Sequence, residues 1–188
     1  MTSFARFISI LCHPFVMALV LVLGVALRVT TPGAALQSVL LVAALAIVPV
    51  AVLMVRQVRK GTWQNVDASR KSERPVLFGV GIIGLLLLIA AAMFLKPASF
   101  LVRGTVAVLI MLAVCALANR WVKVSLHMAF GTLATTTLLC IGSVIGWVLL
   151  PLMPLLAWSR LILKRHRPSE IAIGSLAGIA SALALYYW

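Results

Sequence analysis

The residues best suited to chemistry lie together in one polar segment, residues 159–170, between two apolar runs. The segment holds His166, one of three histidines in the chain, and Glu170, one of three acidic residues. Four cations surround this pair: Arg160, Lys164, Arg165 and Arg167. Fixed positive charges stabilise negative charge that develops during a reaction. A histidine and a carboxylate among several cations therefore indicate chemistry on an anion.

The composition places this segment in a membrane protein. Of 188 residues, 64% are hydrophobic and 10% are charged, and the mean hydropathy is +1.19. Several apolar runs approach the roughly 20 residues that cross a bilayer as a helix. The net charge of +13 would suggest nucleic acid in a soluble protein. Here the cations lie between apolar runs, where they set topology and meet anionic head groups, so we expect the lipid bilayer and no nucleic acid as partner.

We expect an all-α, polytopic transmembrane helix bundle of six to seven spans, with residues 1–188 as a single membrane domain. The first span, at about 7–29, is too long for the core of a signal peptide. Others follow at about 34–56, 76–95, 99–119 and 171–188. The apolar stretch 128–158 would be about 46 Å long as one helix, against a membrane core of about 30 Å. A division at its glycines gives about 125–142 and 147–164, and therefore seven spans.

The number of spans decides where the polar patches lie. With seven spans, the patches after spans two, four and six share one membrane face, whereas six spans put the third patch on the opposite face. We favour seven. The glycine pairs Gly142/Gly146 and Gly174/Gly178 also fit small-xxx-small faces for helix packing.

Each polar patch carries a motif. The first ends in Arg74-Pro75, the second contains Ser125-x-His127, and the third reads Ser159-Arg160-x5-His166-x3-Glu170. In this order the motifs resemble the signature of the type 2 phosphatidic acid phosphatase superfamily, which includes the vanadium haloperoxidases. The pattern of that superfamily is Lys-x6-Arg-Pro, Pro-Ser-Gly-His and Ser-Arg-x5-His-x3-Asp. The resemblance covers about residues 67–180, the motif-bearing core.

The chain departs from this pattern in its first two motifs. Asp67 stands at the lysine position and cannot hold a phosphate oxygen, so we expect Arg70 or Lys71 to substitute for the lysine. Val124 and Leu126 replace the proline and glycine of the second motif. The chain would thus be a divergent member.

The resemblance implies metal-independent phosphate-ester hydrolysis with no cofactor. In such a mechanism His166 attacks phosphorus, Glu170 orients its ring, and His127 protonates the leaving oxygen. The expected phosphate-binding residues are cations and hydroxyls that offer hydrogen bonds to phosphate oxygens: Arg74, Arg160, Ser125, Ser159, Arg70, Lys71 and Lys123.

Several of these residues also have structural interpretations. Glu170, two residues after Pro168, is typical of a helix cap. Lys164, Arg165 and Arg167 fit interfacial charges that set topology. We expect a structural role for His13 beside Pro14.

The distribution of cations predicts orientation. Of 16 lysines and arginines, three (Arg28, Lys96 and Arg103) lie on the face opposite the motifs, which leaves 13 on the motif face. The positive-inside rule then places the motifs on the cytoplasmic side of a bacterial-type plasma membrane.

We therefore expect a phosphatase of a membrane lipid phosphate, of the phosphatidate type or a prenyl phosphate or diphosphate, working through a phosphohistidine. The alternative is a non-catalytic membrane protein with a retained phosphate or lipid head-group site. An intramembrane prenyltransferase is set aside, because the single aspartate of the chain cannot build two aspartate-rich magnesium motifs. The sequence leaves the lipid and the oligomeric state open.

Overall fold

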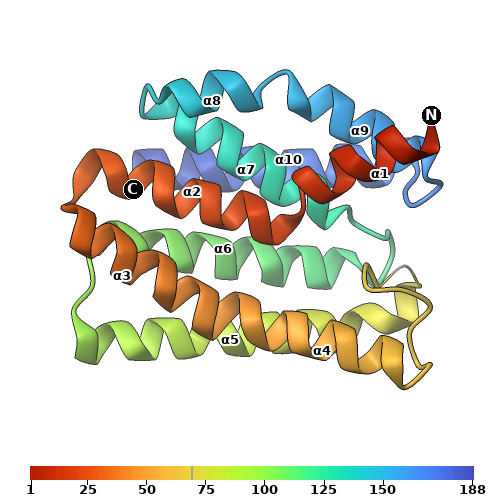
Figure 1. The fold of residues 1–188 in the computed structure, drawn as a ribbon, viewed down its shortest axis with the longest axis horizontal. Coiled ribbons are helices and arrows are strands. Elements are labelled where there is room, and N and C mark those ends of the chain that lie inside the picture. The colour runs from red at the N-terminus through yellow and green to blue at the C-terminus, as the bar shows by residue number, and fades with distance from the viewer. Residues whose placement is uncertain (69) are drawn as a thin grey trace.

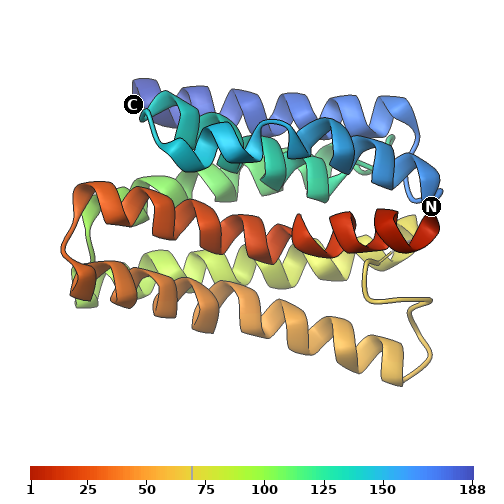
Figure 2. The same ribbon diagram turned by 45° about the horizontal axis from the view of Figure 1, so that its top comes forward.

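The computed structural model describes residues 1–68 and 70–188, and the regular structure of these residues is entirely helical (Figure 1). The helices lie roughly along one long axis, with connecting loops gathered at the two ends (Figures 1 and 2). The all-α expectation is confirmed. In chain order the helices are α1 (Thr2–Leu11), α2 (Pro14–Val29), α3 (Pro32–Val42), the π-helix η1 (Ala43–Ile47), α4 (Val48–Arg59), the 3-10 helix η2 (Lys71–Glu73), α5 (Arg74–Leu95), α6 (Ser99–Ala118), α7 (Leu126–Cys140), α8 (Val144–Leu149), α9 (Leu152–Ile162) and α10 (Pro168–Tyr187).

Within the described residues, five continuous helices are long and apolar enough to cross a membrane. The count is six if α1 and α2, bent by 41° at their junction, form one broken span. The bend follows from Pro14, because the residue before a proline is disfavoured in helical conformation. The protein is therefore built as an integral membrane protein.

The apolar stretch after the second motif is divided, as the seven-span interpretation expected. The chain reverses direction between α7 and α8 (Figures 1 and 2), where Gly142 adopts a left-handed φ of +67°. Gly146 then packs on the main chain of α7, where a Cβ would lie 2.6 Å from the Leu139 nitrogen. However, α7 has only 15 residues. Its length of about 22 Å is shorter than the membrane core of about 30 Å.

The π-helical segment η1 marks a close contact between two helices. Pro49 cannot donate a hydrogen bond to the carbonyl of Leu45, four residues earlier, and the helix widens just before this proline. Gly84 of α5 packs against the same carbonyl, and a Cβ at Gly84 would lie 2.5 Å from the Leu45 oxygen. The distortion thus fits α5 against the helix formed by α3, η1 and α4.

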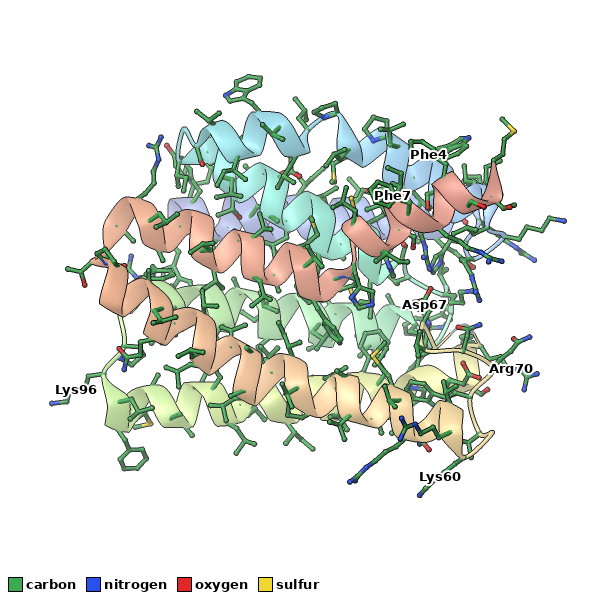
Figure 3. All side chains as sticks on the ribbon, in the orientation of Figure 1. Phe4, Phe7, Lys60, Asp67, Arg70 and Lys96 are labelled. Carbon is green, nitrogen blue, oxygen red and sulfur yellow. The ribbon has the colours of Figure 1, made fainter. Side chains whose placement is uncertain are left out.

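The three motif-bearing patches lie at the same end of the bundle. The loops 60–68, 119–125 and 163–167 all gather at the right-hand end in Figure 1. Figure 3 places Lys60, Asp67 and Arg70 at this end and Lys96 at the opposite one. The three polar patches therefore share one end of the bundle, as the seven-span interpretation predicted.

The helices α7 and α10 pack closely against each other. Both segments also carry histidines of the second and third motifs, since His127 lies in α7 and His166 just before α10. A Cβ at Gly174 would lie 2.4 Å from the carbonyl oxygen of Ser125, and one at Gly178 would lie 2.2 Å from that of Ala129. These glycines therefore form the small-residue packing face that the sequence suggested.

We predict that Gly178→Ala destabilises the protein by about 1–3 kcal/mol, because the added methyl group forces α7 and α10 apart. The measurement is the apparent melting temperature in detergent. Gly79→Ala is the matched control, since a Cβ there meets no atom within 4 Å. Alanine is the better helix former, so the control should be neutral or stabilised. Equal melting temperatures for the two variants would contradict this packing.

Candidate active site

The turn between α9 and α10 presents His166 at the polar end of the bundle. Lys164 adopts a left-handed φ of 52°, which turns the chain after α9. Pro168 occupies the first turn of α10, where its missing N–H has no helical partner to lose. His166 itself is buried, with 7% of its surface exposed. The histidine is thus fixed just before the N-terminus of α10.

Glu170 both caps α10 and orients His166. Its Oε2 lies 2.8 Å from the Nδ1 of His166 and accepts a hydrogen bond of 3.2 Å from the main-chain N–H of Arg167. The two interpretations made for this glutamate are therefore compatible. Because Nδ1 faces the carboxylate, Nε2 is the ring nitrogen left for attack on a ligand. The main chain of Lys123 also hydrogen-bonds the ring. A ligand at the ring would have to replace this hydrogen bond.

Four residues from all three motifs converge in one region. Arg74, His127, Arg160 and His166 all lie within range of mutual electrostatic interaction. Each of them is buried, with at most 7% of its surface exposed. The second and third motifs are also joined directly, because the main-chain N–H of Ser125 donates to the Glu170 carbonyl at 3.1 Å.

Arg74 is buried among neutral acceptors. Its Nε donates to the carbonyl of Ala68 at 3.3 Å, and Nη1 contacts Asn119 Oδ1 at 3.5 Å and the carbonyl of Val124. Among residues 1–68 and 70–188, no carboxylate lies within ion-pair distance of this guanidinium. A buried cation held only by neutral groups gains most from an anionic ligand.

Arg160 is held by an acid from the first motif. Its Nη1 and Nη2 lie 3.4 and 3.5 Å from Asp67 Oδ2, and Nη1 also contacts Ser9 Oγ at 2.6 Å. Asp67 thus reaches from the first polar loop to a cation of α9. At the position where the resembled family has a lysine, this chain therefore has a counter-ion for Arg160.

The surrounding cations keep His166 neutral. Burial lowers the pKa of its imidazole. The positive charges of Arg74, Arg160 and Lys123 lower this pKa further, to about 2. A neutral imidazole retains the lone pair that a nucleophile requires.

Of the remaining predicted phosphate-binding cations, two line a pocket and one does not. Lys71 and Lys123 line a polar pocket together with His166. Their ammonium groups donate to main-chain carbonyls, that of Arg120 at 2.6 Å for Lys71 and that of Arg165 for Lys123. Arg70 extends outward at the bundle end (Figure 3) and does not line this pocket.

The two serines of the motifs differ in their bonding. Ser159 Oγ donates to the carbonyl of Ala5 at 2.7 Å, which ties α9 to α1. Ser125 Oγ is fully buried and has no hydrogen-bond partner within the described part of the chain. Of the two serines, Ser125 is therefore the one whose hydroxyl is not engaged within the described residues, although it lines neither pocket.

The sequence did not indicate that His13 belongs to this region. Its ring centroid lies 5.2 Å from that of His127, and Nδ1 accepts a 3.3 Å hydrogen bond from the N–H of Phe15. The predicted structural role, capping α2, is therefore present, but the ring also faces the site. The signal that could have found it is the His13-Pro14 break inside an apolar run.

His13 and His127, together with Asp67, also form a possible metal-ligand group, since their ligand atoms lie within 4.8 Å of one another. The hydrogen bond from Phe15 places the proton of the neutral His13 ring on Nε2, which makes that nitrogen a donor. Asp67 is paired with Arg160. Both observations indicate that these three residues form a polar part of the cavity lining and not a metal centre.

The two histidines of the motifs face different cavities. His166 and Glu170 line the polar pocket that also contains Lys71 and Lys123. His127 lines an apolar cavity of about 510 Å³ inside the bundle, and its Nε2 is buried with no hydrogen-bond partner in the part of the chain described. Arg74 and Arg160 belong to the polar end of this apolar cavity. The arrangement can hold an anion beside the two arginines and an apolar chain beyond them.

No model of a known protein family matches the chain, and neither a curated protein nor a solved structure matches it.

We predict that His166 makes the protein acid-sensitive. The pKa of about 2 in the folded state lies below the ordinary 6.5, so below about pH 6.5 only the unfolded chain takes up this proton. Stability should therefore fall with decreasing pH, by up to about 1.4 kcal/mol per pH unit. The test compares apparent melting temperatures of wild type and His166→Gln between pH 8 and 4. The wild type should lose more; parallel pH profiles would contradict a depressed pKa.

Proposed function

We propose that the protein is a metal-independent phosphatase of a membrane lipid phosphate. The observation that carries the proposal is that two buried arginines at the polar end of an apolar cavity lie within electrostatic range of the neutral His166, whose partner Glu170 lines the polar pocket with it. The arginines supply charge for the phosphate, and the cavity supplies space for the lipid. The motif resemblance points to the same chemistry.

The first step is attack of His166 Nε2 on phosphorus. The N–P bond forms while the bond from phosphorus to the lipid oxygen breaks, and the leaving oxygen takes a proton from Nε2 of His127. His127 is neutral in the buried site without a ligand and takes up this proton when the anionic substrate binds. Glu170 accepts a hydrogen bond from the Nδ1–H of His166 and stabilises the positive charge that develops on the imidazole. In the second step water attacks phosphorus, the N–P bond breaks, and the proton from water returns to His127.

The placement of the two histidines suits an in-line displacement. His166 approaches from the polar pocket, which gives access to water, whereas His127 faces the apolar cavity, where the lipid alcohol would remain after cleavage. Arg74 and Arg160 interact with both rings. They are therefore positioned to stabilise the phosphoryl group during its transfer.

The charges of the site favour a dianion as ligand. Three cations (Arg74, Arg160 and Lys123) interact there with two carboxylates, Asp67 and Glu170, while His166 is neutral. The site thus has an excess of positive charge without a ligand. A phosphate monoester can displace Asp67 from Arg160 and form the bidentate contacts that guanidinium groups favour.

The pairing of Asp67 with Arg160 also supports a second candidate, a non-catalytic protein that binds lipid phosphate. In the absence of a ligand, Asp67 forms an ion pair with Arg160, the arginine that phosphate hydrolysis would require. Such a protein would bind phosphate or lipid phosphate without releasing phosphate, and Arg160→Ala would abolish binding.

The bundle end that carries the motifs is also the end rich in cations, so we place the site on the cytoplasmic side of a bacterial-type plasma membrane. The membrane would then present the substrate from its inner leaflet.

Purified protein should release inorganic phosphate from lipid phosphates in detergent micelles. His166→Ala should abolish release, and His127→Ala should lower the rate by about 100-fold or more, the usual contribution of a general acid. The measurement is colorimetric phosphate release, with Lys96→Ala at the opposite end of the bundle as the control. Equal rates in wild type and both histidine variants would exclude the mechanism. Binding without any release would favour the second candidate.

A further inference from the structure

The apolar cavity extends along most of the bundle from the site to its opposite end. Beside the site it is lined by His13 and His127, and at the far end by Thr30, Ser99 and Arg103. Between these ends its lining is almost entirely apolar side chains from α2, the helix formed by α3, η1 and α4, and α5, α6 and α7. The cavity therefore has a strongly charged end at the site and a long apolar interior, and its far end carries one exposed cation, Arg103. A molecule with a charged head at the site and an apolar chain matches this lining.

The length of the cavity limits the length of that chain. The lining includes residues at both ends of α2, which has 16 residues and spans about 24 Å. A fully extended polypeptide advances about 3.6 Å over the three backbone bonds of one residue, or about 1.2 Å per bond. An extended hydrocarbon chain of about 20 carbons would therefore fill this length.

The volume of the cavity gives an independent limit. A methylene group is similar in size to a water molecule, which occupies about 30 Å³ in the liquid. A cavity of about 510 Å³ then holds about 17 such groups. Two acyl chains of ordinary length, with about 32 carbons together, would need about twice this volume by the same measure.

We infer that the cavity binds one hydrocarbon chain of about 15 to 20 carbons, so that the ligand of the site is a single-chain lipid phosphate, such as a short prenyl or alkyl phosphate. The number of carbons rests on the agreement of the length and volume estimates. This inference rests on the proposed function, because Arg74 and Arg160 must receive the phosphate for the chain to enter the cavity. It selects against two-chain phosphatidate and against long polyprenyl phosphates.

The chain offers a position for testing this depth limit. Gly104 of α6 lines the far part of the cavity, and a Cβ there meets no atom within 4 Å. A large side chain at this position can therefore occupy the cavity without a main-chain clash. Gly79 of α5 also has no atom within 4 Å of an added Cβ, but it does not line the cavity. Gly79→Trp is thus the matched control for Gly104→Trp.

The experiment measures binding of non-hydrolysable phosphonates to purified protein by native mass spectrometry. The probes are decyl, hexadecyl and eicosyl phosphonate and a dihexadecanoyl two-chain phosphonate. Wild type should bind the hexadecyl compound at least tenfold more tightly than the two-chain compound. Gly104→Trp should weaken eicosyl phosphonate at least tenfold and leave decyl phosphonate unchanged, while Gly79→Trp should resemble wild type.

Equal affinity of wild type for one-chain and two-chain probes would overturn the inference, and so would a Gly104→Trp variant that binds eicosyl phosphonate as wild type does. Phosphate release from the corresponding phosphates is measured in parallel. Chain-length selection in binding without any release would refute the phosphatase and leave the cavity assignment standing. Release without chain-length selection would refute the cavity assignment and leave the phosphatase standing.

Discussion

The close contact between α7 and α10 determines the geometry of the whole site. At Gly174 and Gly178 the two helices approach so closely that an added Cβ would lie 2.4 and 2.2 Å from main-chain oxygens of α7. This contact fixes the segment that carries His127 against the segment that carries His166. The main-chain hydrogen bond from Ser125 to Glu170 extends it to the polar end of the bundle. In an apolar solvent, where burial of apolar surface does not drive helix association, such close packing is a principal source of specificity.

Charge at the end of this bundle is the second constraint. Arg74 and Arg160 are almost completely buried, and an unpaired buried cation costs several kcal/mol. The protein offsets this cost with carbonyl groups around Arg74 and with Asp67 and Ser9 around Arg160. These partners keep the arginines folded inward without a ligand. The same cations hold His166 in the neutral form that can act as a nucleophile.

The sequence predicted the features that depend on local pattern. Apolar runs predicted the helices α3 to α6 closely, and the division of residues 128–158 followed from its excessive length and its glycines. The requirement that the polar patches share a face predicted that Arg74, His127, Arg160 and His166 would lie together. Motif spacing predicted the His166–Glu170 pair, which lies four residues apart and is therefore local.

Features that depend on contacts distant in sequence were not predictable in this way. Asp67 pairs with Arg160, 93 residues away, and Ser9 reaches the same arginine over 151 residues. His13 comes near His127 because α2 packs against α7, which no periodicity in either segment indicates. The apolar cavity likewise arises between helices whose sequences are uniformly apolar.

The most direct test of His166 as the proposed nucleophile is capture of the phosphorylated protein. Purified protein is mixed with a 32P-labelled single-chain lipid phosphate and quenched in denaturant at alkaline pH, which preserves phosphohistidine. We predict a labelled protein in the wild type whose label maps to His166 and is lost in acid, and no label in His166→Ala. Phosphate release by the wild type with equal labelling of His166→Ala, or with label on another residue, would contradict the account.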